Sequence, residues 1–257
     1  MTFPLETLEQ MQVFFWVLVR VSILFFMLPL FGARGIPALW KGGLSMIMAI
    51  VLTPLLPSLP DFPETLSEMF LGVIGELILA LILVIIIKMI FSSVEMAGQF
   101  MSFQMGFAMA RAVDPQTGAQ STVLTQFLYL FTILIFLSID GHHLFIRALA
   151  ASFRIVPPNS LSFDNSIADV IIRISSNMFL YGIKIAAPIM VSLFLSNLCL
   201  GIIARTVPQV NILMVGFPVN LSIGLILFSL ILRNVYPLLQ ELIKDMGELL
   251  IRLIHLM

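Results

Sequence analysis

The chain has 257 residues, of which 60% are hydrophobic and 11% are charged, with a formal net charge of -1. A soluble domain carries about a quarter of its residues as charged groups, so this composition excludes a water-soluble protein and indicates an integral membrane protein. The nearly neutral charge argues against nucleic acid as a partner. The single cysteine, Cys199, excludes an intramolecular disulfide and is expected to be a small core residue.

The first two apolar segments are expected to be helices over about 9–30 and 38–56. Glycines and prolines in PLFGARGIP separate them, and the four prolines of TPLLPSLPDFPE end the second. The acidic N-terminus lacks the basic region of a signal peptide, so the first segment is expected to stay in the mature protein. Together the two segments are expected to form a helical hairpin.

The third segment runs from about Glu64 to Met105 without a proline. As one helix it would be about 60 Å long, twice the ~30 Å thickness of the hydrocarbon core. On a 3.6-residue period, polar residues of its second half fall near one face: Lys88, Ser92, Glu95, Gln99 and Ser102. That face is expected to contact protein or water.

The remaining long helices are expected at about 121–139, 167–204 and 212–254. A turn at Asp140-Gly141 and an amphipathic helix ending at a Pro-Pro pair separate the first two of them. Pro188 lies inside the helix at 167–204 and is expected to kink it. The sequence thus predicts an all-α membrane protein of about six long hydrophobic helices, several of them kinked or longer than a bilayer.

Ionisable residues inside apolar segments are costly unless they are paired or reach water, so they are functional candidates. They are Arg20, Glu76, Lys88, Glu95, Arg173 and Lys184. One interpretation is that they make inter-helix or inter-subunit contacts that set the packing register. The alternative is a relay in a secondary transporter of a small solute, although no paired carboxylates converge on a substrate site.

His142 and His143 are adjacent in the sequence. On a regular helix their rings point in different directions and do not form the i,i+4 pair of a helical metal site. The sequence therefore predicts no metal, and it favours an interfacial role for the two rings. The chain also lacks a phosphate-binding glycine loop and a nucleophile elbow, which argues against an enzyme and against a cofactor.

The segment QMGFAMARAVDPQTGAQS at 104–121 interrupts the apolar chain. One interpretation is an ordinary loop, with Asp114-Pro115 and Gly118 as turn residues. Another is a compliant plug, because methionine fills irregular gaps without a fixed partner geometry. Irregular backbone at membrane depth is tolerated only inside protein or beside a water-filled cavity.

Three segments together resemble the FliR family of flagellar export-gate subunits, which has counterparts in virulence injectisomes. They are GQFMSFQMGFAMARAVDPQTGAQSTVLTQF at 98–127, FLSIDGHHLFIRALAASF at 136–153 and GIIARTVPQVNILMVGFPVNLSIGLIL at 201–227. None is a catalytic signature, but their order and spacing are specific, and the resemblance runs through the whole chain. The segments read closest to the flagellar members.

The resemblance implies a non-enzymatic subunit that assembles with several FliP-like and FliQ-like membrane proteins into a helical pore. Unfolded rod, hook and filament proteins, including those of the proximal rod, would cross the bacterial inner membrane through it at the flagellar basal body. FlhB-like and FlhA-like export components are further expected partners.

The resemblance also divides the chain into a FliP-like part at 1–166 and a FliQ-like helical hairpin at 167–257, with its tip at 205–211. It implies a pore plug in the loop 106–121, with Met105, Gly106, Phe107, Met109, Arg111, Asp114, Pro115 and Gly118 as plug or gate residues. Inter-subunit packing is expected at Glu76, Lys88, Glu95, Gln99, Arg173 and Lys184. The hairpin tip is expected to present Arg205, Pro208, Gln209 and Asn211.

Overall fold

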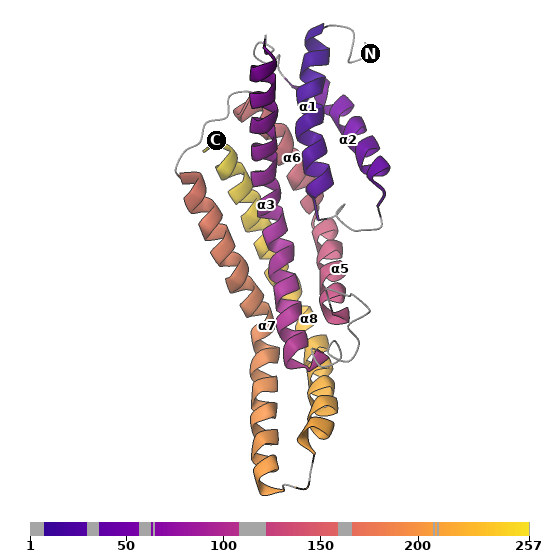
Figure 1. The fold of residues 1–257 in the computed structure, drawn as a ribbon, viewed down its shortest axis with the longest axis vertical. Helices are drawn as coiled ribbons and strands as arrows, with labels where there is room; N and C mark the ends of the chain where they lie inside the picture. Colours follow the sequence, from indigo (N-terminus) through magenta and orange to yellow (C-terminus); the bar gives the residue numbers. More distant parts are fainter. Residues whose placement is uncertain are drawn as a thin grey trace. The chain divides into compact units, whose positions relative to one another are not determined.

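The fold is known from a computed structural model that describes residues 8–29, 36–56, 63, 65–107, 122–158, 166–207, 209 and 211–256. Within these residues every regular element is a helix and none is a strand, which confirms the all-α membrane fold (Figure 1). The elements are α1 (Leu8–Met27), α2 (Ala38–Leu52), the 3-10 turn η1 (Thr53–Leu55), α3 (Leu66–Gln104), α5 (Val123–Ser138), α6 (Gly141–Ile155), α7 (Ser166–Thr206) and α8 (Ile212–Ile254).

Three helices are far longer than a bilayer is thick. α3, α7 and α8 contain 39, 41 and 43 residues, and each is therefore about 60 Å long at about 1.5 Å per residue. Their bounds lie within two residues of the predicted segments. The prediction of overlong helices is confirmed, and Pro188 lies inside α7 without ending it.

By length and composition, α1, α3, α7 and α8 could each cross a membrane, and α5 with α6 could form a fifth, broken span. α2 has only 15 residues and is short for a span, which needs about 20. Pro54 lies in η1 directly after α2, where a missing backbone N–H costs little and the regular helix stops. The six apolar segments therefore supply four or five candidate crossings among the described residues.

Internal contacts divide the chain into two compact units. Unit 1 comprises 1–89, 140–174 and 243–257, and unit 2 comprises 90–139 and 175–242. This division does not follow the predicted boundary at 166, because α3, α7 and α8 each contribute residues to both units. The division into FliP-like and FliQ-like parts is based on resemblance to other subunits and not on contacts within this chain. The boundary at 166 therefore stays a prediction.

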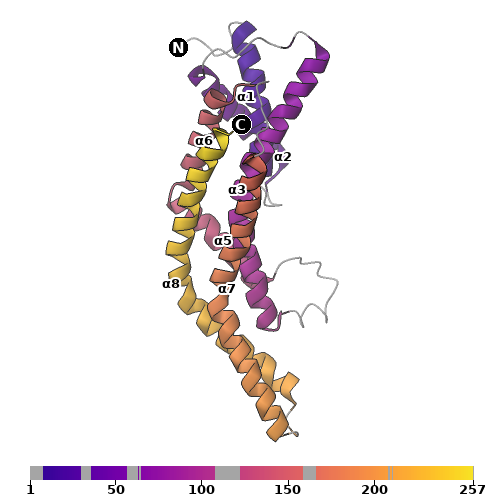
Figure 2. The ribbon, with the colours of Figure 1, turned by 90° about the vertical axis from the view of Figure 1, so that its left-hand side faces the viewer.

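In unit 1, α1 packs against α2 and η1, as expected for a hairpin (Figures 1 and 2). α6 turns one apolar face inward, with Phe145, Leu149 and Phe153 buried at helical spacing. A side chain at Gly247 of α8 would collide with Leu144 of α6, so glycine lets these two helices approach closely.

In unit 2, the second half of α3 packs against parts of three other helices. Glycines lie at the closest approaches, where an added Cβ would overlap a neighbour: Gly98 with Thr125 of α5, Gly182 of α7 with Ser93 and Met96, and Gly224 of α8 with Met105. The buried side chains of this half of α3 include Val94, Ala97 and Met101, and Met105, which directly follows α3, is also buried. These contacts set the position of the end of α3, where the central loop begins.

Candidate functional site

The central loop connects α3 to α5. Residues 108–121 lie outside the described part of the chain, so Met109, Arg111, Asp114, Pro115 and Gly118 are not located. The two ends of the loop are described. We call the residues that form these ends, together with Ser102 and Thr125, the loop base: Ser102, Met105, Gly106, Phe107, Thr122 and Thr125.

Gly106 is where the chain leaves α3. Its N–H donates to the carbonyl oxygen of Phe103 at 3.1 Å, and its φ is +89°, a value that L side chains rarely adopt. A Cβ at this position would also lie 2.9 Å from the ring of Phe217 on α8. Backbone direction and ring packing therefore both require glycine here.

Met105 directly precedes this turn and is fully buried. Its side chain packs against Gly224 of α8, where a Cβ would lie only 2.6 Å from the Met105 Cγ. Phe107 and Gly106 are half-buried. Of the three described residues predicted to belong to the plug, Met105 is therefore a packing residue of unit 2, which holds the start of the loop in place.

A chain of hydroxyl groups holds the other end. The Ser102 and Thr122 oxygens are 2.5 Å apart, and those of Thr122 and Thr125 are 2.8 Å apart. Thr122 also caps α5, because its Oγ1 accepts from the Thr125 N–H at 3.3 Å. The end of α3 and the start of α5 are therefore held together at the loop base. A threonine before the apolar run VLTQFLYL was a readable capping signal, but the partner Ser102 was not, because it lies 20 residues away.

Unit 1 contains a buried ion pair between α1 and α3. The Arg20 guanidinium donates to both Glu76 carboxylate oxygens, at 2.5 and 2.7 Å, and the two residues are 0% and 3% exposed. Arg20 also donates to Ser152 Oγ at 3.0 Å and to the Val156 carbonyl oxygen at 3.1 Å. The ring of Phe153 lies 4.0 Å from the guanidinium carbon. All of these partners belong to this chain, so Arg20 and Glu76 form a contact between helices of one chain, and inter-subunit packing at Glu76 stays a prediction.

The other candidate polar residues lie nearer the surface. Lys88, Gln99, Arg173 and Lys184 are exposed and Glu95 is half-buried. Lys184 lies over the Tyr181 ring at 5.3 Å. The expectation that Cys199 is a core residue was wrong, because Cys199 is exposed on α7.

At the other end of unit 2, α7 and α8 lie side by side before their connection (Figures 1 and 2). Arg205, Gln209 and Asn211 are exposed there, and Pro208 lies outside the described residues. Asn211 caps the N-terminal end of α8, because its side-chain oxygen accepts from the Met214 N–H at 3.4 Å.

A polar contact between α7 and α8 was not predicted from the sequence. Asn220 Nδ2 donates to Asn197 Oδ1 at 2.6 Å, and Ser196 Oγ donates to Asn220 Oδ1 at 2.9 Å. Hydrogen bonds of this kind hold helices together where water is scarce. Polar residues 23 and 24 positions apart give no periodic signal that would identify them as partners.

The fold defines a multi-pass helical membrane protein. The loop base holds the two ends of the loop between α3 and α5 by packing and hydrogen bonds. The family described as "Bacterial export proteins, family 1" matches residues 11–246, and the chain belongs to this family, among its FliR members.

Three relatives, each named flagellar biosynthetic protein FliR, match over nearly their whole length. The Bacillus subtilis (strain 168) protein is 34% identical over 243 residues, covering 91% of this chain and 93% of the relative. The protein of Pectobacterium carotovorum subsp. carotovorum is 31% identical over 239 residues, covering 92% and 90%. The Escherichia coli (strain K12) protein is 28% identical over 245 residues, covering 95% and 94%. The chain is therefore a membrane component of the flagellar export apparatus.

Proposed function

We propose that the chain is a non-enzymatic subunit of the flagellar type III export gate. With FliP-like and FliQ-like membrane subunits it forms the pore through which unfolded rod, hook and filament proteins cross the inner membrane. FlhB-like and FlhA-like export components act beside it. The observation that carries this proposal is the match to flagellar FliR proteins over more than 90% of this chain.

The exposed surface of the long helices supports an assembly. Of the candidate membrane span in α7, only 22% is buried within this chain, and the share for α8 is the same. The corresponding share for α3 is 50%. A helix of about 60 Å exceeds the ~30 Å hydrocarbon core, so lipid alone does not cover such faces. Large exposed apolar surface outside lipid is typical of protein interfaces. Neighbouring subunits would cover these faces of α7 and α8.

Within that assembly, the loop 106–121 acts as the plug of the closed pore. The loop base supports this role, because Gly106, Met105 and the Ser102–Thr122 contact hold the two ends of the loop in place. The transporter alternative loses one of its proposed residues, because Glu76 is already bonded to Arg20.

The composition of the purified complex tests the export-gate proposal. The tagged chain, extracted gently from its own host's membranes, would be weighed by native mass spectrometry. We expect a large complex that contains one copy of this chain and several copies of two smaller membrane proteins. A lone monomer or homodimer would contradict the proposal and favour the transporter.

Deleting Ala110 to Thr117 tests the plug. The deletion leaves the loop base intact, so the complex should still assemble, but ion leakage through it should rise. The matched control is Thr122→Ser, which keeps the capping hydroxyl and should not raise the leak. An assembled deletion variant that leaks no more than the control would rule out the plug role and leave the assembly proposal standing.

A further inference from the structure

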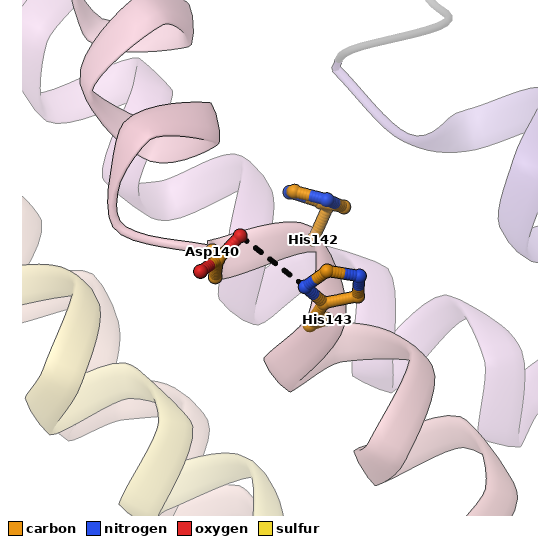
Figure 3. Close-up of side chains that lie close together, drawn as sticks. All are labelled: Asp140, His142 and His143. Atoms are coloured by element: carbon orange, nitrogen blue, oxygen red, sulfur yellow. Dashed lines mark ion pairs between the residues drawn. The ribbon is translucent and has the colours of Figure 1, made fainter.

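Three potential metal ligands lie together at the start of α6 in unit 1. Figure 3 shows Asp140, His142 and His143 at the turn where α6 begins. One oxygen or nitrogen from each side chain lies within 4.8 Å of the others. Neither the loop base nor the Arg20–Glu76 pair uses these residues.

The backbone of Asp140 explains why they meet. Asp140 has φ 57° and ψ 29°, the left-handed region, immediately before the first helical residue Gly141. Its carbonyl oxygen accepts from the His143 N–H at 2.9 Å, while its carboxylate makes no capping bond. The carboxylate instead lies 3.2 Å from His143 Nδ1. The turn thus places an acidic oxygen over the first turn of α6.

The two imidazole rings are close although they are neighbours in the sequence. Their centroids are 4.2 Å apart and their planes are inclined by 35°. The expectation of diverging rings assumed two residues inside a regular helix. Here both belong to the first turn, where no preceding helical turn restricts their side chains.

His142 carries a second, independent signal. Its Nδ1 atom is buried and has no hydrogen-bond partner among the described residues. A buried ring nitrogen without a partner has lost its hydrogen bonds to water, and no hydrogen bond within the protein offsets that desolvation cost. Binding of a cation by this imidazole would supply an interaction and fix its tautomer.

We propose that Asp140, His142 and His143 bind one divalent transition-metal ion of the zinc type. Two imidazoles and one carboxylate suit Zn²⁺, with water in a fourth position, and they do not suit the all-oxygen coordination of Ca²⁺ or Mg²⁺. Ligand atoms of a tetrahedral zinc site lie about 3.3 Å apart, so modest side-chain rotations complete the site. The Asp140 and His143 side chains are 71% and 60% exposed, which gives the ion an entry path.

Zinc titration of the full-length chain in detergent, purified with a histidine-free tag, tests the site. In competition with a chromophoric chelator, we expect one zinc ion per chain. Asp140→Asn, His142→Ala and His143→Ala should each weaken binding by about tenfold or more. The matched control is His255→Ala, because His255 is exposed and its Nδ1 is 2.8 Å from the Ile251 carbonyl oxygen.

A second readout separates ligand loss from misfolding. Zinc should raise the melting temperature of the unmodified chain and of His255→Ala, but not that of the triple variant. The metal-free triple variant should melt at the same temperature as the metal-free parent, and Co²⁺ should give visible absorption bands in the parent and in His255→Ala but not in the triple variant. Absence of zinc binding by the parent, or equal binding by the triple variant, would overturn the proposal.

Discussion

At the residue scale, the Arg20–Glu76 pair is the interaction most sensitive to a single change. Glu76→Gln leaves the Arg20 charge buried without a counter-charge, which costs about 3–5 kcal/mol of stability. We expect a large fall in the thermal unfolding temperature in detergent. Glu248→Gln is the control, because Glu248 is exposed on α8 within the same unit and its loss should change little.

The pair also permits a compensating experiment. Replacing both partners together, as Arg20→Met with Glu76→Leu, removes the buried charges and should recover most of the lost stability. Ser152 would keep its bond to the Leu149 carbonyl oxygen. If Glu76→Gln unfolds at the same temperature as Glu248→Gln, the pair does not stabilise unit 1 as described.

At the element scale, the end of α3 depends on Gly106. Gly106→Ala places a side chain at positive φ, which costs about 1–2 kcal/mol, and it also pushes the Phe217 ring away. We expect lower thermal stability and reduced swimming motility, because the loop leaves α3 at a changed angle.

Gly201→Ala is the matched control for this substitution. Gly201 lies on α7 with nothing within 4 Å of an added Cβ, and alanine in a helix is favoured over glycine by about 1 kcal/mol. The control should therefore be neutral or stabilising. Equal melting temperatures and motility for the two alanine variants would show that Gly106 is not required for the turn.

At the scale of the whole molecule, both compact units are built from both halves of the chain. Unit 1 contains 140–166 from the first part and 243–257 from the second. We therefore predict that fragments 1–166 and 167–257 associate in the membrane when co-expressed, as measured by co-purification through a tag on one fragment.

Two substitutions sharpen the fragment experiment. Gly247→Leu in the second fragment collides with Leu144 of the first and should reduce co-purification, whereas Gly201→Leu has free space and should not. Fragments that fail to co-purify would weaken the partition at 166. That result would leave the role in export untouched, because it rests on the family match.

Much of the architecture was predictable because local rules govern it. Uninterrupted apolar runs require helices in a membrane, and proline and glycine mark their ends, so α3 and α8 lie within two residues of their predicted bounds. The turn at Asp140-Gly141 was predicted from the sequence, whereas Gly106 was predicted only as a plug residue. The approach of Gly106 to the Phe217 ring was not predictable, because Phe217 is distant in the sequence.

The sequence by itself determined the all-α membrane class, the overlong helices and the family. Composition, hydrophobic run length and the order of the three landmark segments are all properties of the linear sequence and do not depend on which helices pack together. Only the tertiary structure decided that Arg20 bonds Glu76, that Ser102 meets Thr122 and that Asn220 bonds Asn197. These pairings depend on side-chain directions and helix approaches, and in a chain that is apolar almost throughout, no periodic pattern specifies which polar residue meets which.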